Sequence, residues 1–342
     1  MIRLTRRGFG GVVAGGLATA TFARSRAFAQ GTRVRVGLLS LTSHAPSIIA
    51  AAKGYFAEQG LDVEFVSFQA AQPMAVAIAS NDVDFGVTAI SGGLISLAER
   101  GAVKVIGGAL QESTDVEGQK ILVSKAAYDS GVTTPTDLEG KRFGITTAGS
   151  SFHYMAHKIA DGEGFARDTM ELVPLNGVPA VIASLRSGQI DAWSIVPNIA
   201  GGLVASGDVV EIGEISDYIE DYQVTAVFTS SRMAAEEPDT VRSFLAGFAR
   251  GVDDYNAALV DQTMSEEEVV EISRMIHEYV YTDRPFEDAD SAIRAGAMRV
   301  NADARMNLTS IEDQLAWFVS EGLVPADASI ETLVDTSLVE TY

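Results

Sequence analysis

Apolar residues along the first two thirds of the chain alternate between short, β-branched runs and longer runs at helical spacing. The first short run, 33–39, ends in a small polar turn and is followed by a helix-like run at 48–56. A strand-like piece at 61–66, another apolar helix and a third strand at 83–87 come next. This order predicts a β-α-β-α-β unit with parallel strands, which is typical of α/β proteins.

The same order returns later in the chain at a constant offset. Gly144 stands 107 residues after Gly37, and Asp191 stands 107 residues after Asp84. The repeat predicts two copies of one unit, and therefore two lobes that face each other across a cleft. Because the two aspartates take matching places at the third strands, we interpret them as a structural feature of the repeat, and not as a pair of catalytic carboxylates.

The rest of the pattern predicts how the two lobes connect. Strand-like segments at 119–124 and 223–229 would carry the chain into the second lobe and back, which makes a two-strand hinge. Amphipathic helical runs fill the C-terminal part, and we expect their aromatic residues to pack on the first lobe. We therefore predict an α/β fold in which lobe one comprises 30–119 and 224–342, and lobe two comprises 120–223.

Ligands of open α/β sheets bind at the carboxyl ends of the strands, so the turns at those ends are candidate binding positions. The turn at 147–151 leads into a helix, whose first N–H groups and dipole suit an anion or a polar ligand; the alternative is an ordinary capped helix. Ser150 or Ser151 would cap this helix, and losing a Ser150 cap would cost about 1 kcal/mol. The candidate ligand-binding residues are Ser43, His44, Gln69, Thr88, Ser91, Ser150, Ser151, Phe152, His153, Trp193 and Asn198.

Two of these candidates have other interpretations. Trp193 could stack on a planar ligand or cover an apolar tail, or it could pack between sheet and helix. His153 and His157 stand four residues apart, a spacing that can hold a metal ion on a helix. Since neither an HExxH glutamate nor a third ligand accompanies them, we expect no metal site, with His153 in the cleft and His157 at the surface.

The N-terminus has the features of a cleaved export signal. Residues 1–29 combine twin arginines at Arg6 and Arg7, a glycine- and alanine-rich apolar stretch, and an Ala-x-Ala site that ends at Ala29. They predict export through the twin-arginine route and a soluble protein in the periplasm. The chain has 25 basic and 46 acidic residues, and loss of the signal's five arginines leaves a net charge of −26. This charge repels nucleic acids and anionic lipids, so we expect no nucleic-acid partner.

Sequence features of enzymes are scarce. The chain has no cysteine, which excludes disulfides, thiolate nucleophiles and iron–sulfur clusters. The G-x-S-x-G, Walker A and G-x-G-x-x-G patterns are also absent. We therefore expect a binding protein without catalytic residues and without a cofactor.

Four segments resemble the NMT1/THI5-like family of periplasmic substrate-binding proteins, which includes the sulfonate, taurine and thiamine-precursor binders of ABC importers. The segments lie at 51–64, 83–87, 137–144 and 185–192, and they match the family's A-x-x-x-G-[YF]-F-x-x-x-G-L-D-V, DFGV, D-L-x-G-K and L-x-x-G-x-[IV]-D-A patterns. The resemblance implies a two-lobed periplasmic binding protein of type II, or Venus-flytrap, architecture. It also implies a small-molecule ligand and an ABC permease as partner.

The resemblance does not identify the ligand, but it restricts the chemical classes to which the ligand can belong. Many members carry an acid before a proline where this chain has Val196 before Pro197, which disfavours a cationic ligand group there. The polar turns suit a small organic anion, a sulfonate or a carboxylate. A neutral heteroaromatic such as a thiamine-type pyrimidine, stacked on Trp193, is the alternative. A ligand-sensing subunit and a pyrimidine-synthase-type enzyme remain further alternatives, although the enzyme is linked to a cysteine-rich motif. We expect a monomer that compacts when it binds ligand.

Overall fold

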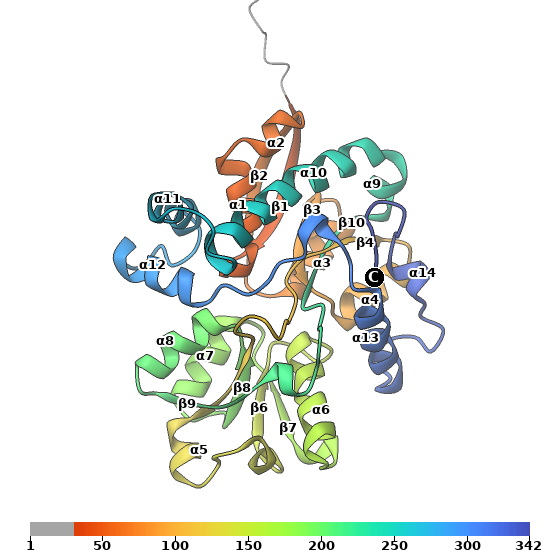
Figure 1. Ribbon diagram of the computed structural model, residues 1–342. Coiled ribbons are helices and arrows are strands. Elements are labelled where there is room, and N and C mark those ends of the chain that lie inside the picture. The colour runs from red at the N-terminus through yellow and green to blue at the C-terminus, as the bar shows by residue number, and fades with distance from the viewer. Residues whose placement is uncertain (1–30) are drawn as a thin grey trace, which may run out of the picture.

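The computed structural model describes residues 31–342, so the predicted signal segment 1–29 lies outside the described residues. Two five-stranded sheets form the centres of two lobes (Figure 1). The first sheet has the strand order β2 (Leu61–Phe68), β1 (Thr32–Leu39), β3 (Phe85–Ala89), β10 (Thr225–Ser230) and β4 (Val103–Gly108). The second sheet has the order β7 (Glu171–Pro174), β6 (Arg142–Ile145), β8 (Ala192–Ile195), β5 (Lys120–Ser124) and β9 (Val209–Glu214).

The repeat predicted from the sequence is visible in the pairing of the strands. β1 lies parallel to β2 and β3, and β6 lies parallel to β7 and β8. The register is the same in both units, because Val36 pairs with Phe85, and Phe143 pairs with Ala192. Each residue of the second pair stands 107 positions after its counterpart in the first pair. The two lobes are therefore built on copies of one unit.

The two aspartates of the repeat make equivalent backbone contacts. The carboxylate of Asp84 accepts a hydrogen bond of 2.7 Å from the N–H of Arg35. The carboxylate of Asp191 accepts one of 2.9 Å from the N–H of Arg142. Each aspartate thus ties the start of a third strand to the first strand of its sheet. These contacts agree with the structural role inferred from the repeat.

Two strands cross between the lobes. β5 enters the second sheet antiparallel between β8 and β9, and β10 returns to lie antiparallel between β3 and β4. The segments before these strands run beside each other, since the N–H of Glu112 donates to the carbonyl of Tyr222 at 2.8 Å. Gln111 and Gln223 form an isolated bridge next to this contact. This arrangement is the two-strand hinge that the sequence predicts.

Helices cover both sheets. The first repeat unit contains α1 (Ala45–Ala52), α2 (Tyr55–Glu58), α3 (Ala71–Ala79) and α4 (Gly92–Glu99). The second lobe contains α5 (Lys125–Asp129), α6 (Ser151–Glu163), α7 (Val178–Arg186) and α8 (Pro197–Ala205). The C-terminal part contains α9 (Ser231–Glu236), α10 (Pro238–Tyr255), α11 (Glu266–His277), α12 (Phe286–Ala295), α13 (Leu308–Ser320) and α14 (Ile330–Leu333).

The long helix α10 completes the core of the first lobe. Its Phe244 stacks on Phe85 of β3 and on Phe56 of α2, with 4.0 and 5.1 Å between the ring centroids. The later helices also reach the second lobe, since Gly296 after α12 lies against Asn198 of α8. The C-terminal region therefore packs on lobe one, as predicted, and additionally touches lobe two. Within residues 31–342, no helix combines the length and the apolar character needed to span a membrane.

Candidate functional site

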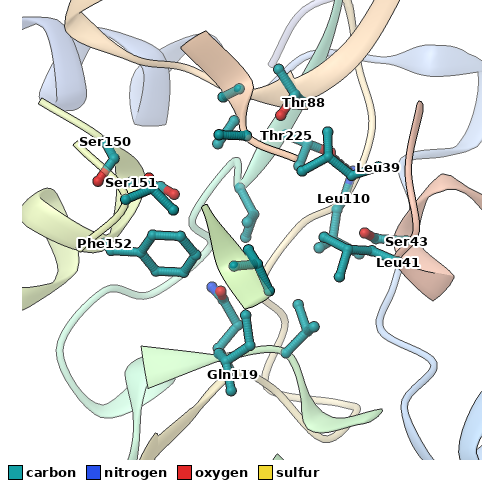
Figure 2. A pocket seen from close by; sticks show the side chains of 18 of the residues that line it. Leu39, Leu41, Ser43, Thr88, Leu110, Gln119, Ser150, Ser151, Phe152 and Thr225 are labelled. Carbon is teal, nitrogen blue, oxygen red and sulfur yellow. Dashed lines mark hydrogen bonds between the residues drawn. The ribbon is translucent and has the colours of Figure 1, made fainter. Parts of the chain in front are cut away.

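A cavity lies between the two lobes (Figure 2). The carboxyl ends of β1, β3, β6 and β8 all point at it, as expected for a ligand site in open α/β sheets. The first lobe contributes Leu39, Leu41, Ser43, His44 and Thr88. The second lobe contributes Thr146, Ser150, Ser151, Phe152, Ile195 and Val196. The hinge contributes Leu110, Gln119, Val224 and Thr225.

The turn between β6 and α6 supplies polar groups to this cavity. Gly149 has a left-handed backbone (φ 72°), which turns the chain into α6 at Ser151. Ser150 is the N-cap residue and is 4% exposed, but its Oγ makes no capping bond and has no partner within residues 31–342. The expected cap is therefore not formed, and the expected cost of its loss does not apply. The Ser150 hydroxyl and the first N–H groups of α6 are left for a ligand.

The described residues that line the cavity include polar groups but none with a formal charge at pH 7. His44 is its one lining histidine among the described residues, and burial lowers the pKa of His44 to about 3, so the ring is neutral at pH 7. The Nδ1 atom of His44 has no hydrogen-bond partner in the described part of the chain. None of the described lining residues is Asp, Glu, Lys or Arg. The charge of an ionic ligand would therefore be met by N–H and O–H groups.

Six of the eleven predicted ligand-binding residues line the cavity, namely Ser43, His44, Thr88, Ser150, Ser151 and Phe152. Figure 2 shows Ser150, Ser151 and Phe152 on one side, and Ser43 and Thr88 on the other. Polar groups from both repeat units thus converge on one space, although they are far apart in the sequence.

Two predicted residues lie beside the cavity wall. Trp193 is fully buried and packs against Phe152, with 5.4 Å between the ring centroids, so it does not line the cavity. His153 also lies outside the lining, because its ring turns toward His157 and Trp317. The expectation that His157 lies at the surface is wrong, since its side chain is buried against Trp317.

The other three predicted residues make contacts within the protein. Ser91 caps α4 through its hydroxyl. Asn198 of the second lobe donates a hydrogen bond of 2.9 Å to the hydroxyl of Thr42 in the first lobe. The carbonyl of Gln69, whose side chain is exposed, accepts the N–H of Val178 at 3.4 Å. The last two contacts join the lobes beside the cavity, so the structure represents a closed form.

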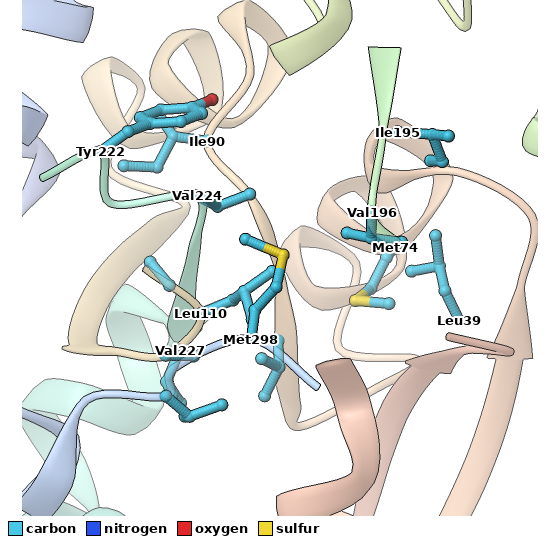
Figure 3. Packing of buried hydrophobic residues seen from close by; sticks show 14 of the residues in the cluster. Leu39, Met74, Ile90, Leu110, Ile195, Val196, Tyr222, Val224, Val227 and Met298 are labelled. Atoms are coloured by element: carbon cyan, nitrogen blue, oxygen red, sulfur yellow. The ribbon is translucent and has the colours of Figure 1, made fainter. Parts of the chain in front are cut away.

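Sequence reasoning missed the hinge residue Gln119 and the apolar part of the lining, which includes Leu39, Leu41, Leu110, Val178, Ile195, Val196 and Val224. Figure 3 shows Leu39, Leu110, Ile195, Val196 and Val224 among the buried apolar residues. A signal for them existed, because each lies at or close to one end of a predicted strand or crossing segment. Apolar residues at such positions look like core residues until the two lobes are placed together. Between residue 31 and residue 342, no three His, Cys, Asp or Glu side chains are arranged to hold a metal ion.

Comparison with known proteins identifies the family. The profile described as NMT1/THI5 like matches residues 41–258. The chain belongs to the NMT1/THI5-like family. A binding protein of Brucella abortus (strain 2308) is 25% identical over 247 residues, which are 71% of this chain and 73% of that protein. A Bacillus subtilis protein named as binding aliphatic sulfonates is 26% identical over 225 residues, or 64% of each chain.

Solved structures of the same architecture show the fold of this family member. The alkanesulfonate-binding protein SsuA of Xanthomonas axonopodis pv. citri, bound to MOPS, superposes with a TM-score of 0.67 at 16% identity. The superposition covers 92% of this chain and all of the SsuA chain. The chain therefore has the two-lobed fold of periplasmic binding proteins, which confirms the fold class predicted from the sequence.

Proposed function

We propose that this protein is the solute-binding component of an ABC importer. It captures one small organic anion, a sulfonate or a carboxylate, between its lobes and delivers it to the permease subunits without chemical turnover. The carrying observation is a cavity shared by both lobes, in which the buried Ser150 hydroxyl at the start of a 13-residue helix has no partner in the described part of the chain. The names of its relatives, which are binding proteins, support this role.

The surroundings of Ser150 favour an anionic head group. The dipole of α6 and its first N–H groups attract negative charge, and the Ser150 hydroxyl adds a donor. Apolar side chains such as Leu39, Leu41 and Val196 suit a short hydrocarbon part. Since the described lining holds no carboxylate, it has no group that would pair with an ammonium.

The alternative ligand, a neutral heteroaromatic, loses its main support. Its stacking partner was expected to be Trp193, and Trp193 does not line the cavity. Phe152 is the described aromatic residue that remains in the lining. A ligand-sensing subunit would have the same site and would differ in its partner.

The cellular setting belongs to the same proposal. We infer a monomer in the periplasm that is exported by the twin-arginine segment 1–29. We place the lobe boundaries at 119/120 and 223/224; the starts of β5 at Lys120 and of β10 at Thr225 support this division. Closure needs no more than a ligand that favours the closed form over the open one.

Calorimetry and small-angle scattering test the proposal on the exported chain. Propanesulfonate and butyrate represent the two anionic head groups, and a thiamine-type pyrimidine represents the alternative. We expect one saturable site for an anion, and a smaller radius of gyration in the saturated protein. Binding of the pyrimidine without either anion would overturn the ligand class, and an unchanged radius would overturn the closing mechanism.

A further inference from the structure

His153 and His157 lie outside the cavity, but they contact the turn that forms its wall. The N–H of Gly149 donates to Nδ1 of His153 at 3.1 Å. Nε2 of His153 lies 3.1 Å from Nε2 of His157. The carbonyl of Gly149 accepts the N–H of Gly92, at the start of α4 in the first lobe, at 2.9 Å. Gly149 therefore connects the cavity turn to the histidine pair and to the opposite lobe.

These contacts determine where the protons of the neutral pair lie. Because Nδ1 of His153 accepts a hydrogen bond, the proton of this ring must be on Nε2. That N–H points at Nε2 of His157, which must accept it and therefore carries its own proton on Nδ1. Nδ1 of His157 lies 3.4 Å from a carboxylate oxygen of Glu321, just after α13, as a close contact without hydrogen-bond geometry. A chain of contacts thus runs from the cavity turn to α13.

Helix α13 covers the pair from the other side. The ring of Trp317 meets both imidazoles edge-on, with 5.1 Å to His153 and 5.5 Å to His157 between ring centroids. Trp317 is itself buried. The contact between α6 and α13 therefore depends on how the two histidine rings are placed.

Charged groups from three elements face the pair. They are Asp161 on α6, Arg167 and Asp168 in the turn that follows it, and Glu321 at the end of α13. Arg167 pairs with both Asp161 and Glu321. Burial lowers the pKa of His153 to about 4, and the neighbouring His157 adds to this shift. Burial also lowers the pKa of His157, against the opposing effect of Glu321. Both rings are therefore held neutral at pH 7.

We propose that His153 and His157 position the cavity turn and act as a proton-sensitive lock on the closed lobes. A proton on Nδ1 of His153 would face the N–H of Gly149. A proton on Nε2 of His157 would face the N–H of His153. Either event replaces a hydrogen bond by a contact between two donors, which frees the turn at 149–151 and loosens α6 from α13. This lock rests on the proposed function. Through it, acidification promotes release of the ligand.

The test measures the Kd of propanesulfonate, whose own charge stays constant, at about pH 7.5 and about pH 5. The double variant His153→Asn/His157→Gln keeps amide oxygens that can replace the two accepting nitrogens, but it cannot titrate. In the wild type, we expect the Kd to rise about tenfold on acidification, because the open form binds protons more readily than the closed form. In the double variant, the expected change is less than about twofold.

The chain has four histidines, and His277 on α11 supplies the control. His277→Gln should keep the pH dependence of the wild type. An equal pH dependence in the wild type and the double variant would overturn the lock. If propanesulfonate binds at neither pH, the proposed ligand class fails, and NMR titration of the ligand-free protein then tests the lock. We expect the indole signal of Trp317 to change as the rings of His153 and His157 take up protons. Titration of the two rings that leaves Trp317 unaffected would overturn the lock.

Discussion

At the scale of single residues, the Ser150 hydroxyl is buried at the start of a helix but has no hydrogen-bond partner among residues 31–342. Within this part of the chain, Ser150→Ala removes a donor for the ligand but no hydrogen bond of the protein. We therefore expect the free energy of unfolding to change by less than about 0.5 kcal/mol. The Kd of propanesulfonate should rise about tenfold, which corresponds to losing one hydrogen bond to a charged group. Calorimetry and thermal unfolding of the variant measure the two effects.

Ser47 offers a matched control for this prediction. Its hydroxyl is also buried and unpaired among the described residues, but it lies on α1 outside the cavity lining. Ser47→Ala should leave both the stability and the Kd close to the wild-type values. Equal losses of affinity in the two variants would argue that the start of α6 does not hold the head group.

Glu112 in the hinge makes stability depend on pH. Burial raises the pKa of Glu112 from 4.5 to about 7, although Gln119 donates two hydrogen bonds to its carboxylate. Between these two pH values the folded protein holds a proton that the unfolded chain has lost. The contribution of this group is therefore complete below about pH 4.5 and is lost as the pH rises through about 7.

Glu112→Gln removes this dependence, because the amide cannot titrate. Relative to the variant, the wild type should lose up to about 1.4 kcal/mol of unfolding free energy per pH unit in that window. Urea denaturation at several pH values measures the difference. Glu139→Gln, at an exposed position, serves as the control and should run parallel to the wild type. Parallel curves for Glu112→Gln as well would show that Glu112 is charged in the folded protein.

At the scale of elements, the packing of α1 against α10 requires a glycine. A methyl group on Gly251 of α10 would collide with the carbonyl oxygen of Pro46 in α1. Gly251→Ala must push the two helices apart, and we expect it to destabilise the first lobe by about 1 to 3 kcal/mol. Denaturant unfolding of the variant and the wild type measures this loss.

The same substitution in another helix should have the opposite sign. Gly201 lies inside α8, and a methyl group there would have no neighbour within 4 Å among residues 31–342. Gly201→Ala should stabilise the protein by about 0.5 to 1 kcal/mol, because alanine loses less conformational freedom in a helix. If Gly201→Ala also destabilises the protein, α8 has no space for the added methyl group.

The order of the elements could be predicted because each strand and helix of the repeat has its own apolar pattern. The direction of side chains within an element could not be predicted in the same way. Ser150, Ser151 and Phe152 line the cavity, whereas His153, about 100° further around α6, faces α13. In β8 all four residues are buried, so no alternation indicates which face Trp193 takes. The contact of Tyr154 with Asp313 joins residues 159 positions apart, beyond any local pattern.

At the scale of the whole molecule, the surface and the cavity differ in charge. Residues 30–342 carry a net charge of −26, while the described cavity lining is neutral. An approaching anion therefore meets a repulsive field that no cation of the described lining offsets. Sites that bind anions through Lys or Arg lose affinity when salt screens the attraction. In the present site, by contrast, affinity for the anion should increase when salt is added.

Salt screens this repulsion, since the Debye length falls from about 30 Å at 0.01 M to about 8 Å at 0.15 M ionic strength. We expect the Kd of propanesulfonate to decrease severalfold over this range, as measured by calorimetry. Two salts with different anions must be compared, because screening depends on ionic strength alone, whereas competition for the site depends on the anion. A Kd that increases with both salts to the same extent would mean that a cationic side chain holds the head group. The neutral start of α6 would then not be the place where the ligand's charge is bound.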